Sequence, residues 1–365
     1  TKMIIYILTL IAGILAGIFT GLIPGIHINL IAATILSISY YRLPIPSLLI
    51  FITAMAITHT FLDFIPSIFL GAPSEETALS ILPGHHFLLE GKANQAIKLT
   101  TIGSTIAIIL TFILLPIFLK ILAPLQDFVT KMISFLLLWI IIFLIYNEQR
   151  KTLPFLILIL SGIIGICSTN LQISQPILPL LTGFFATSTL ITSIKSHTQI
   201  PPQEKINFKI NKYRLIKPTF TTFLISPICC LIPGIGANQS AIIGTTFFKH
   251  TKEQFLILLG SINTLIISSS LIILYITQRP RTGIAKTIQQ ITTLTPTNLT
   301  TIMITILITT LVAIPLTIFI ANIFSKNISK INYTKTSIVI IIFLTGTTTI
   351  ITGLIGLLVL AASTI

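Results

Sequence analysis

The residues of this chain best suited to bind a ligand form two near-copies of one short segment. Residues 21–29 read Gly-Leu-Ile-Pro-Gly-Ile-His-Ile-Asn, and residues 230–238 read Cys-Leu-Ile-Pro-Gly-Ile-Gly-Ala-Asn. A Pro-Gly pair inside an apolar helix removes one backbone donor and permits a positive φ, so the helix must stop and restart. In lipid, the freed backbone groups need protein or a water-filled cavity around them. A break that occurs twice, more than half the chain apart, therefore indicates a binding site rather than a plain anchor.

A helix that restarts after such a break directs free N–H groups and a partial positive charge outward. This arrangement favours an anionic group of a substrate. His27 would bind that group when protonated or relay a proton, although it is equally an ordinary hydrogen-bonded side chain, and Gly236 replaces it in the second copy. The predicted substrate-binding residues at the breaks are Pro24, Gly25, His27, Asn29, Pro233, Gly234, Gly236, Asn238 and Gln239.

Carboxylates are rare in this chain, with 8 Asp and Glu in 365 residues, so their positions are informative. Glu75 and Glu76 follow a turn that ends in Ser74, a candidate N-cap, and they would occupy the first turn of a helix. They either cap that helix at the membrane surface or face a cavity as a proton or cation site. Asp63 follows an apolar run, which favours a span end over a buried coupling residue. The candidate coupling or gating residues are Asp63, Glu75 and Glu76.

The short helix that begins at Ser74 is expected to end at Pro83-Gly84, which makes it too short to span a membrane. The segment from about residue 63 to 91 is therefore interpreted as a re-entrant hairpin or an interfacial loop. The side chains on its exit side would be His85, His86, Glu90 and Lys92. Among the other histidines, His59 is a weaker candidate for the site.

The composition requires a membrane protein. Hydrophobic residues make up 53% of the chain, charged residues make up 8%, and the mean hydropathy is +1.02. The net charge of +14 would indicate nucleic acid in a soluble chain, but here the basic residues lie in connections between apolar runs. That placement is typical of topology determinants and contacts with membrane lipid, so nucleic-acid binding is not expected. The three cysteines lack metal-ligand spacing, and no metal or cofactor is expected.

Apolar runs of about 20 residues favour helices over barrel strands of roughly ten residues, so the expected fold class is all-α and polytopic in the cell membrane. About nine to twelve transmembrane helices are expected, because each broken unit either crosses or re-enters. The hydrophilic stretches near residues 195–217, 278–290 and 325–335 are expected to be loops. The expected helices are residues 3–23, a piece ending near 40, 44–62, 96–122, 128–146, 153–171, 176–194, 218–232, 237–248, 255–277, 299–324 and 336–362.

The duplicated break divides the chain into an amino-terminal membrane half, residues 1–194, and a carboxy-terminal half, residues 218–365. The basic loop 195–217 joins them and is placed in the cytoplasm by the positive-inside rule. Whether the repeat is inverted depends on an odd or even number of intervening crossings, which the expected span count leaves open. Gly103-Ser104 and Gly260-Ser261 are a second pair of similar positions. Gly13, Gly17 and Gly21 recur every four residues, which suits close helix packing.

These motifs resemble the large membrane permease of the tripartite tricarboxylate transporters, in its compact archaeal branch. The resemblance lies in residues 21–27, in Phe69–His85 with Glu90-Gly91 and Gly103-Ser104 beyond, and in Leu231–Gly236. It implies a secondary transporter with inverted repeats that takes up carboxylates with a small membrane subunit and an extracytoplasmic binding protein. The positions carried over from the family's motifs are Pro24, Gly25, Pro73, Ser74, Pro233 and Gly234.

Together these features predict a secondary active transporter for a small anionic solute, expected to be a carboxylate, coupled to H⁺ or Na⁺. The alternative is a translocase for a lipid-linked anionic headgroup, which would use the same positive helix ends. An intramembrane enzyme ranks last, because the sequence contains no His-Glu-x-x-His motif, nucleophile elbow or phosphate loop.

Overall fold

The computed structural model describes residues 2–23, 43–71, 77–173, 176–195, 200–204, 211–232, 235–330 and 333–364. All regular elements within these ranges are helices. The longer ones are α1 (Lys2–Leu22), α3 (Ile45–Leu62), α6 (Ala93–Ile117), α7 (Ala123–Asn147), α8 (Thr152–Asn170), α11 (Tyr213–Leu231), α13 (Lys252–Thr277), α15 (Pro296–Asn327) and α16 (Tyr333–Thr364). The shorter ones are α4 (Phe64–Leu70), η1 (Ala78–Ser80), α5 (Ile81–Leu89), η2 (Phe118–Leu122), α9 (Ile177–Leu181), η3 (Thr182–Thr187), α10 (Ser188–Lys195), α12 (Ala237–Phe247), α14 (Gly283–Ile291) and η4 (Ile328–Lys330).

Seven helices of the described part are long and apolar enough to cross a membrane. They are Lys2–Leu22, Ile45–Leu70, Ala93–Ile121, Thr152–Asn170, Lys252–Thr277, Pro296–Asn327 and Thr334–Thr364. The predicted all-α, polytopic membrane fold is therefore confirmed. The expected segments beyond these seven are residues 128–146, 176–194, 218–232 and 237–248, and a piece ending near residue 40 that lies outside the described ranges. The last of the described ones corresponds to α12, which has 11 residues.

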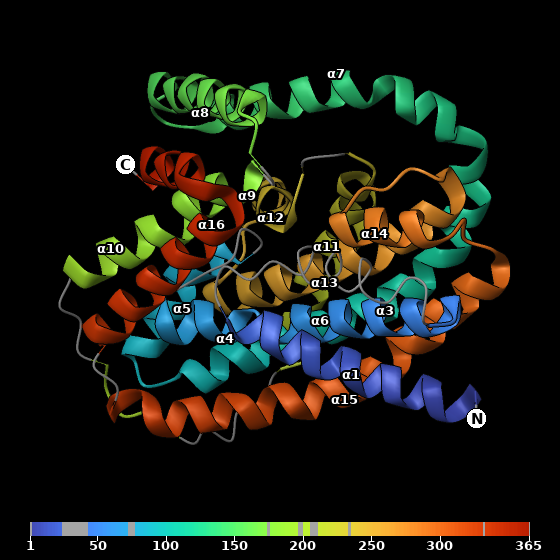
Figure 1. Ribbon diagram of the computed structural model, residues 1–365, viewed down its shortest axis with the longest axis horizontal. Helices are drawn as coiled ribbons and strands as arrows, with labels where there is room; N and C mark the ends of the chain where they lie inside the picture. Colours follow the sequence, from blue (N-terminus) through green and yellow to red (C-terminus); the bar gives the residue numbers. More distant parts are fainter. Residues whose placement is uncertain are drawn as a thin grey trace.

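The centre of the molecule is formed by α3 with its continuation α4, and by α13. In both spans 94% of the most apolar window is buried, compared with 6% in α8. Around them, α1 packs on α3, α6 and α11 pack on α13, and α15 packs on α3 and α6. Figure 1 shows α1, α3, α6, α13 and α15 along the long axis of the molecule, with α7 and α8 at one edge.

Glycines set the closest helix contacts. On α1, a Cβ at Gly13 would lie 2.5 Å from the carbonyl oxygen of Phe51, and one at Gly17 would lie 2.6 Å from that of Met55, both on α3. The predicted close packing of the glycine-stepped first helix is confirmed. Small residues allow such contacts because helix association in lipid depends on dispersion between closely approaching backbones.

The same device joins α6 to α13. A Cβ at Gly103 would lie 2.1 Å from the oxygen of Ile257, and one at Gly260 would lie 2.2 Å from the oxygen of Thr100. The Ser104 hydroxyl donates to the Gly260 carbonyl at 3.2 Å. The two Gly-Ser pairs therefore face each other across one helix contact. Their interpretation as equivalent positions of two halves stays a prediction, with Gly103 on α6 and Gly260 on α13.

The order of the helices along the chain supports a repeat. In the described part, α1, α3, α5 and α6 follow one another around the first Pro-Gly segment much as α11, α13, α14 and α15 do around the second. Contacts cross between the two sets, since α3 packs on α15 and α6 packs on α13. Each central helix, α3 or α13, thus contacts the fourth helix of the other set, α15 or α6.

The equivalent helices run in opposite directions. Asn94, at the start of α6, donates to Asn322, near the end of α15, at 3.2 Å, so these two helices are antiparallel. In Figure 1, α4 continues α3 toward the left of the view whereas α14 follows α13 on the right. Opposite directions of equivalent helices are the property of an inverted repeat.

Three elements differ from the sequence-based expectations. The span that was expected to end at residue 62 continues through α4 to Leu70. The stretch 278–290, expected to be a loop, contains α14, which Thr282 caps by accepting a hydrogen bond from the Ala285 N–H at 3.2 Å. Finally, α16 is two helical pieces joined by a kink at Gly353, where φ is 71°, a backbone conformation that glycine adopts without a Cβ penalty.

The α6–α13 contact yields a first prediction. Gly260→Ala would place a methyl group against the α6 backbone, so we expect a loss of about 1–3 kcal/mol in the free energy of unfolding, the usual cost of overpacking. The measurement is the melting temperature of the purified protein in detergent. Gly162→Ala on α8 is the matched control, because nothing lies within 4 Å of its Cβ position. Equal melting temperatures for the two variants would contradict the glycine contact.

Candidate functional site

Most predicted site residues lie outside the part of the chain that the structure describes. These are Pro24, Gly25, His27, Asn29, Pro73, Ser74, Glu75, Glu76, Pro233 and Gly234. The described candidates are Asp63, Gly236, Asn238 and Gln239, and the segments that flank the missing ones are also described. The structure therefore describes the residues that flank the candidate segments on both sides.

The second Pro-Gly segment lies between two helices. α11 ends at Leu231, and Ile232 has extended backbone angles of φ −98° and ψ 118°. α12 begins at Ala237 with Gly236 as its N-cap. The Gly236 N–H donates to Oε1 of Gln239 at 3.1 Å, so Gln239 satisfies one free donor at the start of α12. The helix is interrupted where the sequence predicts it.

Asn238 joins this segment to the amino-terminal half. It is buried in the first turn of α12, and its Oδ1 accepts a hydrogen bond from the Leu79 N–H at 3.4 Å. Leu79 belongs to η1, the turn of helix that follows the Pro73–Glu76 segment. The structure thus brings together residues beside two of the motifs that the sequence singles out.

A chain of hydroxyl groups continues from η1 into α4. Ser80 Oγ and Ser67 Oγ lie 2.7 Å apart, and both hydroxyls are within hydrogen-bond distance of the Thr77 carbonyl oxygen, at 2.7 and 3.2 Å. Ser67 lies on α4, one helical turn after Asp63. Polar groups therefore extend from the η1 segment toward the junction of α3 and α4.

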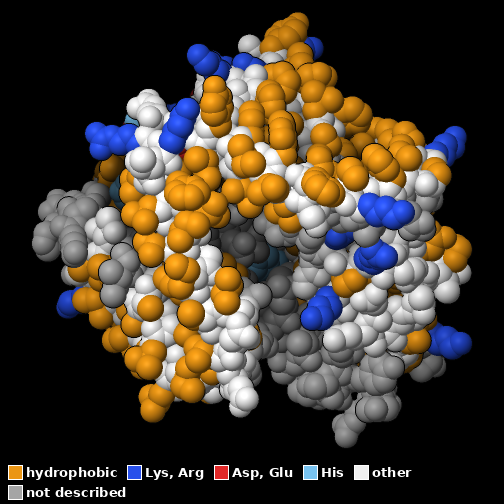
Figure 2. Space-filling view, turned by 90° about the horizontal axis from the view of Figure 1, so that it is seen from above, with side chains coloured by type: hydrophobic (Ala, Val, Ile, Leu, Met, Phe, Trp, Pro, Cys, Tyr) orange, Lys and Arg blue, Asp and Glu red, His pale blue; other side chains and the backbone are white. Residues whose placement is uncertain are grey.

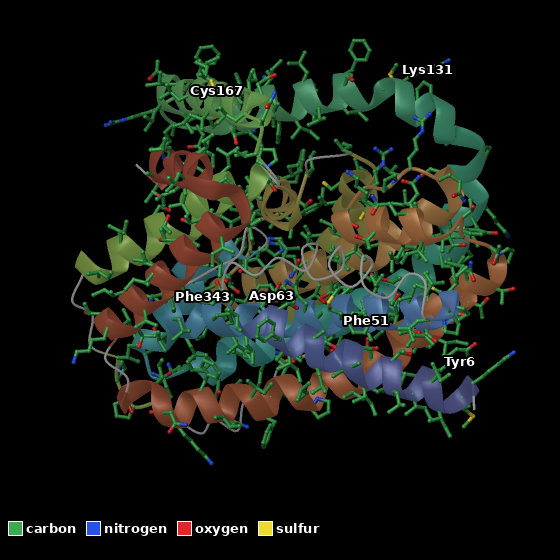
Figure 3. All side chains as sticks on the ribbon, viewed as in Figure 1. Tyr6, Phe51, Asp63, Lys131, Cys167 and Phe343 are labelled. Atoms are coloured by element: carbon green, nitrogen blue, oxygen red, sulfur yellow. The ribbon has the colours of Figure 1, made fainter. Side chains whose placement is uncertain are left out.

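Asp63 lies at that junction and is only 3% exposed. The expectation that it marks the end of a span is wrong, because α3 and α4 form one span that continues to Leu70. Nδ2 of Asn263 on α13 donates to Asp63 Oδ2 at 2.8 Å. Figure 3 shows Asp63 near the middle of the molecule, well away from the edge positions of Lys131 and Cys167. Ionisable residues inside a membrane span are rare and mark ion or substrate pathways in many membrane proteins.

His59 lies one turn before Asp63 on α3. Its Nε2 is 3.9 Å from Asp63 Oδ2, and its Nδ1 is 3.1 Å from the Thr20 hydroxyl on α1. Just beyond, the Thr264 hydroxyl of α13 donates to the Thr60 hydroxyl at 3.2 Å. Helices α1, α3 and α13 thus meet in one buried polar cluster, defined here as Thr20, His59, Thr60, Asp63, Asn263 and Thr264.

This cluster contains the only buried acidic or basic side chains among the residues whose burial the structure describes, which are His59 and Asp63. Asp63 was predicted as a candidate and His59 as a weaker one, whereas Asn263 and Thr20 were not predicted. A signal for Asn263 exists, because it is the one amide between Phe255 and Thr277, and polar residues within spans mark functional positions.

The α5–α6 turn departs from the expectation. Pro83-Gly84 does not end a helix but lies inside α5, which runs from Ile81 to Leu89. Proline is accommodated because the first turn of a helix has no intrahelical use for its N–H groups. His86 and Glu90 form an exposed ion pair at 2.9 Å, and the hydrogen bond from Lys92 lowers the pKa of the Glu90 carboxyl.

The linker between the halves is attached to this turn. Gln203 Oε1 accepts from the Ala93 N–H at 3.0 Å, and Gln203 Nε2 donates to the Leu88 carbonyl at 3.0 Å. The Glu204 N–H donates to the carbonyl of Gly91 at 2.8 Å. Gly91 has a φ of 75°, which explains the glycine of the Glu90-Gly91 motif.

The described surface offers one hollowed region in the view of Figure 2. A histidine side chain is visible inside the hollow, Lys and Arg side chains lie on the surrounding surface, and no coloured carboxylate is visible on this face. In the described ranges, no group of three His, Cys, Asp or Glu residues is placed to hold a metal ion. The chemistry available to the buried polar cluster is hydrogen bonding and proton binding by a carboxylate and an imidazole.

Comparisons with known proteins support one family. A family model described as "Tripartite tricarboxylate transporter TctA family" matches residues 7–365. An uncharacterized protein of Methanocaldococcus jannaschii is 30% identical over 295 residues, which cover 78% of this chain and 72% of that protein. No solved structure matches the chain.

The buried polar cluster yields a second prediction. Asn263→Leu removes a donor from a buried carboxylate, so we expect the free energy of unfolding to fall by about 3 kcal/mol. The measurement is the melting temperature in detergent.

A control and a double variant sharpen this test. Asn322→Leu, which breaks the amide pair with Asn94, should cost only about 1 kcal/mol because neither partner is charged. Adding Asp63→Leu to Asn263→Leu should restore part of the loss, since no carboxylate is then left without its amide donor. Strictly additive losses in the double variant would contradict the interaction.

Proposed function

Because the chain belongs to the tripartite tricarboxylate transporter TctA family, we propose that it is a secondary active transporter for a small anionic solute, coupled to protons or sodium ions. The family is one of transporters and not of enzymes, and its members act on tricarboxylates in tripartite systems with a small subunit and a binding protein. The chain is accordingly a multi-pass membrane transporter. Its solute, expected to be a carboxylate, its coupling ion and its own need for partners are part of the proposal.

The observation that carries the proposal is the hydrogen bond between Asp63 and Asn263. It joins α3 to α13, the equivalent central helices of the two halves, in the middle of the buried part of the molecule. Inverted-repeat transporters hold substrate and coupling ion near the midplane, where the two repeats meet. We therefore assign coupling to Asp63, with Glu75 and Glu76 as further coupling or gating candidates.

The substrate site is proposed beside this hydrogen bond, at the two Pro-Gly segments. Asn238 supports this placement, because it lies directly after the second segment and contacts the residues that follow Pro73–Glu76. The N-terminus of α12 would direct its free N–H groups at the anion. The divisions of the repeat are proposed at residues 1–194 and 218–365, with the linker 195–217 on the cytoplasmic side.

A third prediction concerns the second break. Replacing Pro233 and Gly234 by alanine should let α11 continue into α12 and redirect the N–H groups, while membrane insertion is retained. Losing one charged hydrogen bond costs about 1.5–3 kcal/mol, so uptake should fall about ten- to a hundredfold. The measurement is solute uptake into proteoliposomes.

Pro227→Ala is the matched control, because this proline lies inside α11 without breaking it. Normal uptake by the Pro233 and Gly234 variant would refute the site. The equivalent change at Pro24 and Gly25 tests the first break.

A fourth prediction identifies the solute class. A ligand that binds only the folded state raises the melting temperature, by about 2.7 kcal/mol of stability at a concentration 100 times its Kd. Di- and tricarboxylates, amino acids and polyprenyl phosphates are tested with and without sodium. We expect stabilisation by a carboxylate. Stabilisation by polyprenyl phosphates alone would replace this proposal with a translocase of a lipid-linked headgroup.

A further inference from the structure

We propose that the ion coupled to transport is a proton, and that it binds between His59 and Asp63. This inference rests on the transporter function proposed above and chooses between its two coupling ions. It is carried by the arrangement of donors and acceptors around the two side chains, which lie one turn apart on α3 and are both buried.

The hydrogen bonds of Thr20 determine where the neutral imidazole holds its proton. The Thr20 hydroxyl donates to the carbonyl oxygen of Gly17 at 3.3 Å. Its proton is therefore in use, and it accepts the hydrogen bond from His59 Nδ1 at 3.1 Å. A neutral His59 thus carries its proton on Nδ1 and directs the lone pair of Nε2 toward Asp63.

The gap between His59 and Asp63 fits one proton. Nε2 of His59 and Oδ2 of Asp63 are 3.9 Å apart, which is longer than a hydrogen bond. Two acceptors that face each other repel, and a proton bound to Nε2 converts the contact into a charge-assisted hydrogen bond. When one proton from solution binds, the neutral imidazole becomes imidazolium. The net charge of the His59–Asp63 pair then changes from −1 to 0.

The described contacts of Asp63 Oδ2 are with nitrogen atoms that can donate a proton. Its Oδ2 is approached by Nδ2 of Asn263 at 2.8 Å and by Nε2 of His59. An amide nitrogen can only donate, so this contact also fixes which end of the Asn263 amide faces the carboxylate. Sodium would instead take several oxygen ligands, so the dependence of citrate binding on sodium distinguishes the two ions.

Among the described residues, the other charged groups on the helices around α3 are all at least partly exposed. The elements packed against α3 are α1, α4, α6, α13, α14 and α15. Among the described residues, the Thr20 hydroxyl on α1 contacts His59, and the Asn263 amide on α13 contacts Asp63. The described titratable side chains of those helices are all at least partly exposed, and they are Lys2, Tyr6, Lys98, Lys252, Glu253, Tyr275, Lys286 and Lys326.

Proton binding at this position would control the binding of an anion. Without the proton, Asp63 is a buried negative charge that repels an anionic solute. With the proton, the His59–Asp63 pair is neutral and the repulsion disappears. Ser67, one helical turn after Asp63, is hydrogen-bonded to Ser80, and the neighbouring Leu79 N–H donates to Asn238 beside the proposed substrate site. We therefore expect the proton to bind before the solute.

The test is citrate binding by the purified protein between about pH 8 and 9.5, where citrate itself is almost entirely the trianion. Linkage of one proton to binding makes the affinity fall about tenfold per pH unit above the pKa of the pair. The slope is expected in the wild type and should be lost in His59→Gln and in Asp63→Asn, which keeps the shape of the side chain. Proteoliposomes that contain a pH-sensitive dye should show acidification of the lumen when citrate is added outside.

Two control variants separate this pair from histidines in general. His250 Nε2 also contacts a threonine hydroxyl, that of Thr221, at 3.2 Å, and His86 forms an exposed i, i+4 pair with Glu90. His250→Gln and His86→Gln should keep the wild-type slope.

The outcomes distinguish the inference from the proposed function. Citrate binding that requires sodium, with the same pH dependence in wild type and His59→Gln, would overturn the proton site and leave the transporter intact. Stabilisation by none of the anionic solutes in the panel would instead overturn the proposed function, and the proton site with it.

Discussion

The arrangement of this molecule depends on the close approach of α6 to α13. Gly103 and Gly260 let the two backbones touch, since a Cβ at either position would lie within 2.2 Å of a carbonyl oxygen on the other helix. This contact joins the two halves and fixes α13 along its length, with Thr111 and Ser268 hydrogen-bonded at 2.6 Å two turns further on. Asn263 lies three residues after Gly260 on the same helix. The reach of its amide to Asp63 therefore depends on a packing contact that contains no charged group.

The proposed repeat accounts for the central position of the polar cluster and for its lack of symmetry. Antiparallel equivalent helices bring α3 and α13 together near their middles, so side chains from both halves meet there. The halves nevertheless contribute different chemistry, since α3 provides His59 and Asp63 while α13 provides the Asn263 amide. The same asymmetry appears in the Pro-Gly segments, where His27 of the first copy corresponds to Gly236 of the second. A duplicated scaffold thus supports a single buried carboxylate.

Hydropathy and turn residues were enough to predict the fold class and most helix positions. The segment expected at 255–277 corresponds to α13, and the one expected at 299–324 corresponds to α15. The wrong predictions concern positions where the local sequence is compatible with either the end or the continuation of a helix. Pro83 both ends helices and begins them, and Asp63 looks like a span end because an apolar run stops there. Hydropathy also does not say which helices are neighbours, so the contact between Gly103 and Gly260 and the Asn263 partner of Asp63 could not be predicted. The predicted residues from Pro73 to Glu76 and at both Pro-Gly pairs lie outside the described ranges.

A carrier of anions that holds a buried carboxylate must manage an electrostatic conflict. Two like charges about 10 Å apart repel by about 1.7 kcal/mol at an effective dielectric constant of about 20, which is more than a tenfold loss of affinity for each charge of the solute. Burial also disfavours the charged carboxylate itself. The Asn263 amide and the nearby imidazole oppose this effect through their contacts with Oδ2. A carboxylate in this position is therefore costly both to the fold and to the binding of an anion. Its retention is explained if its charge changes during the transport cycle, because the same repulsion then makes the solute bind in one protonation state and leave in the other.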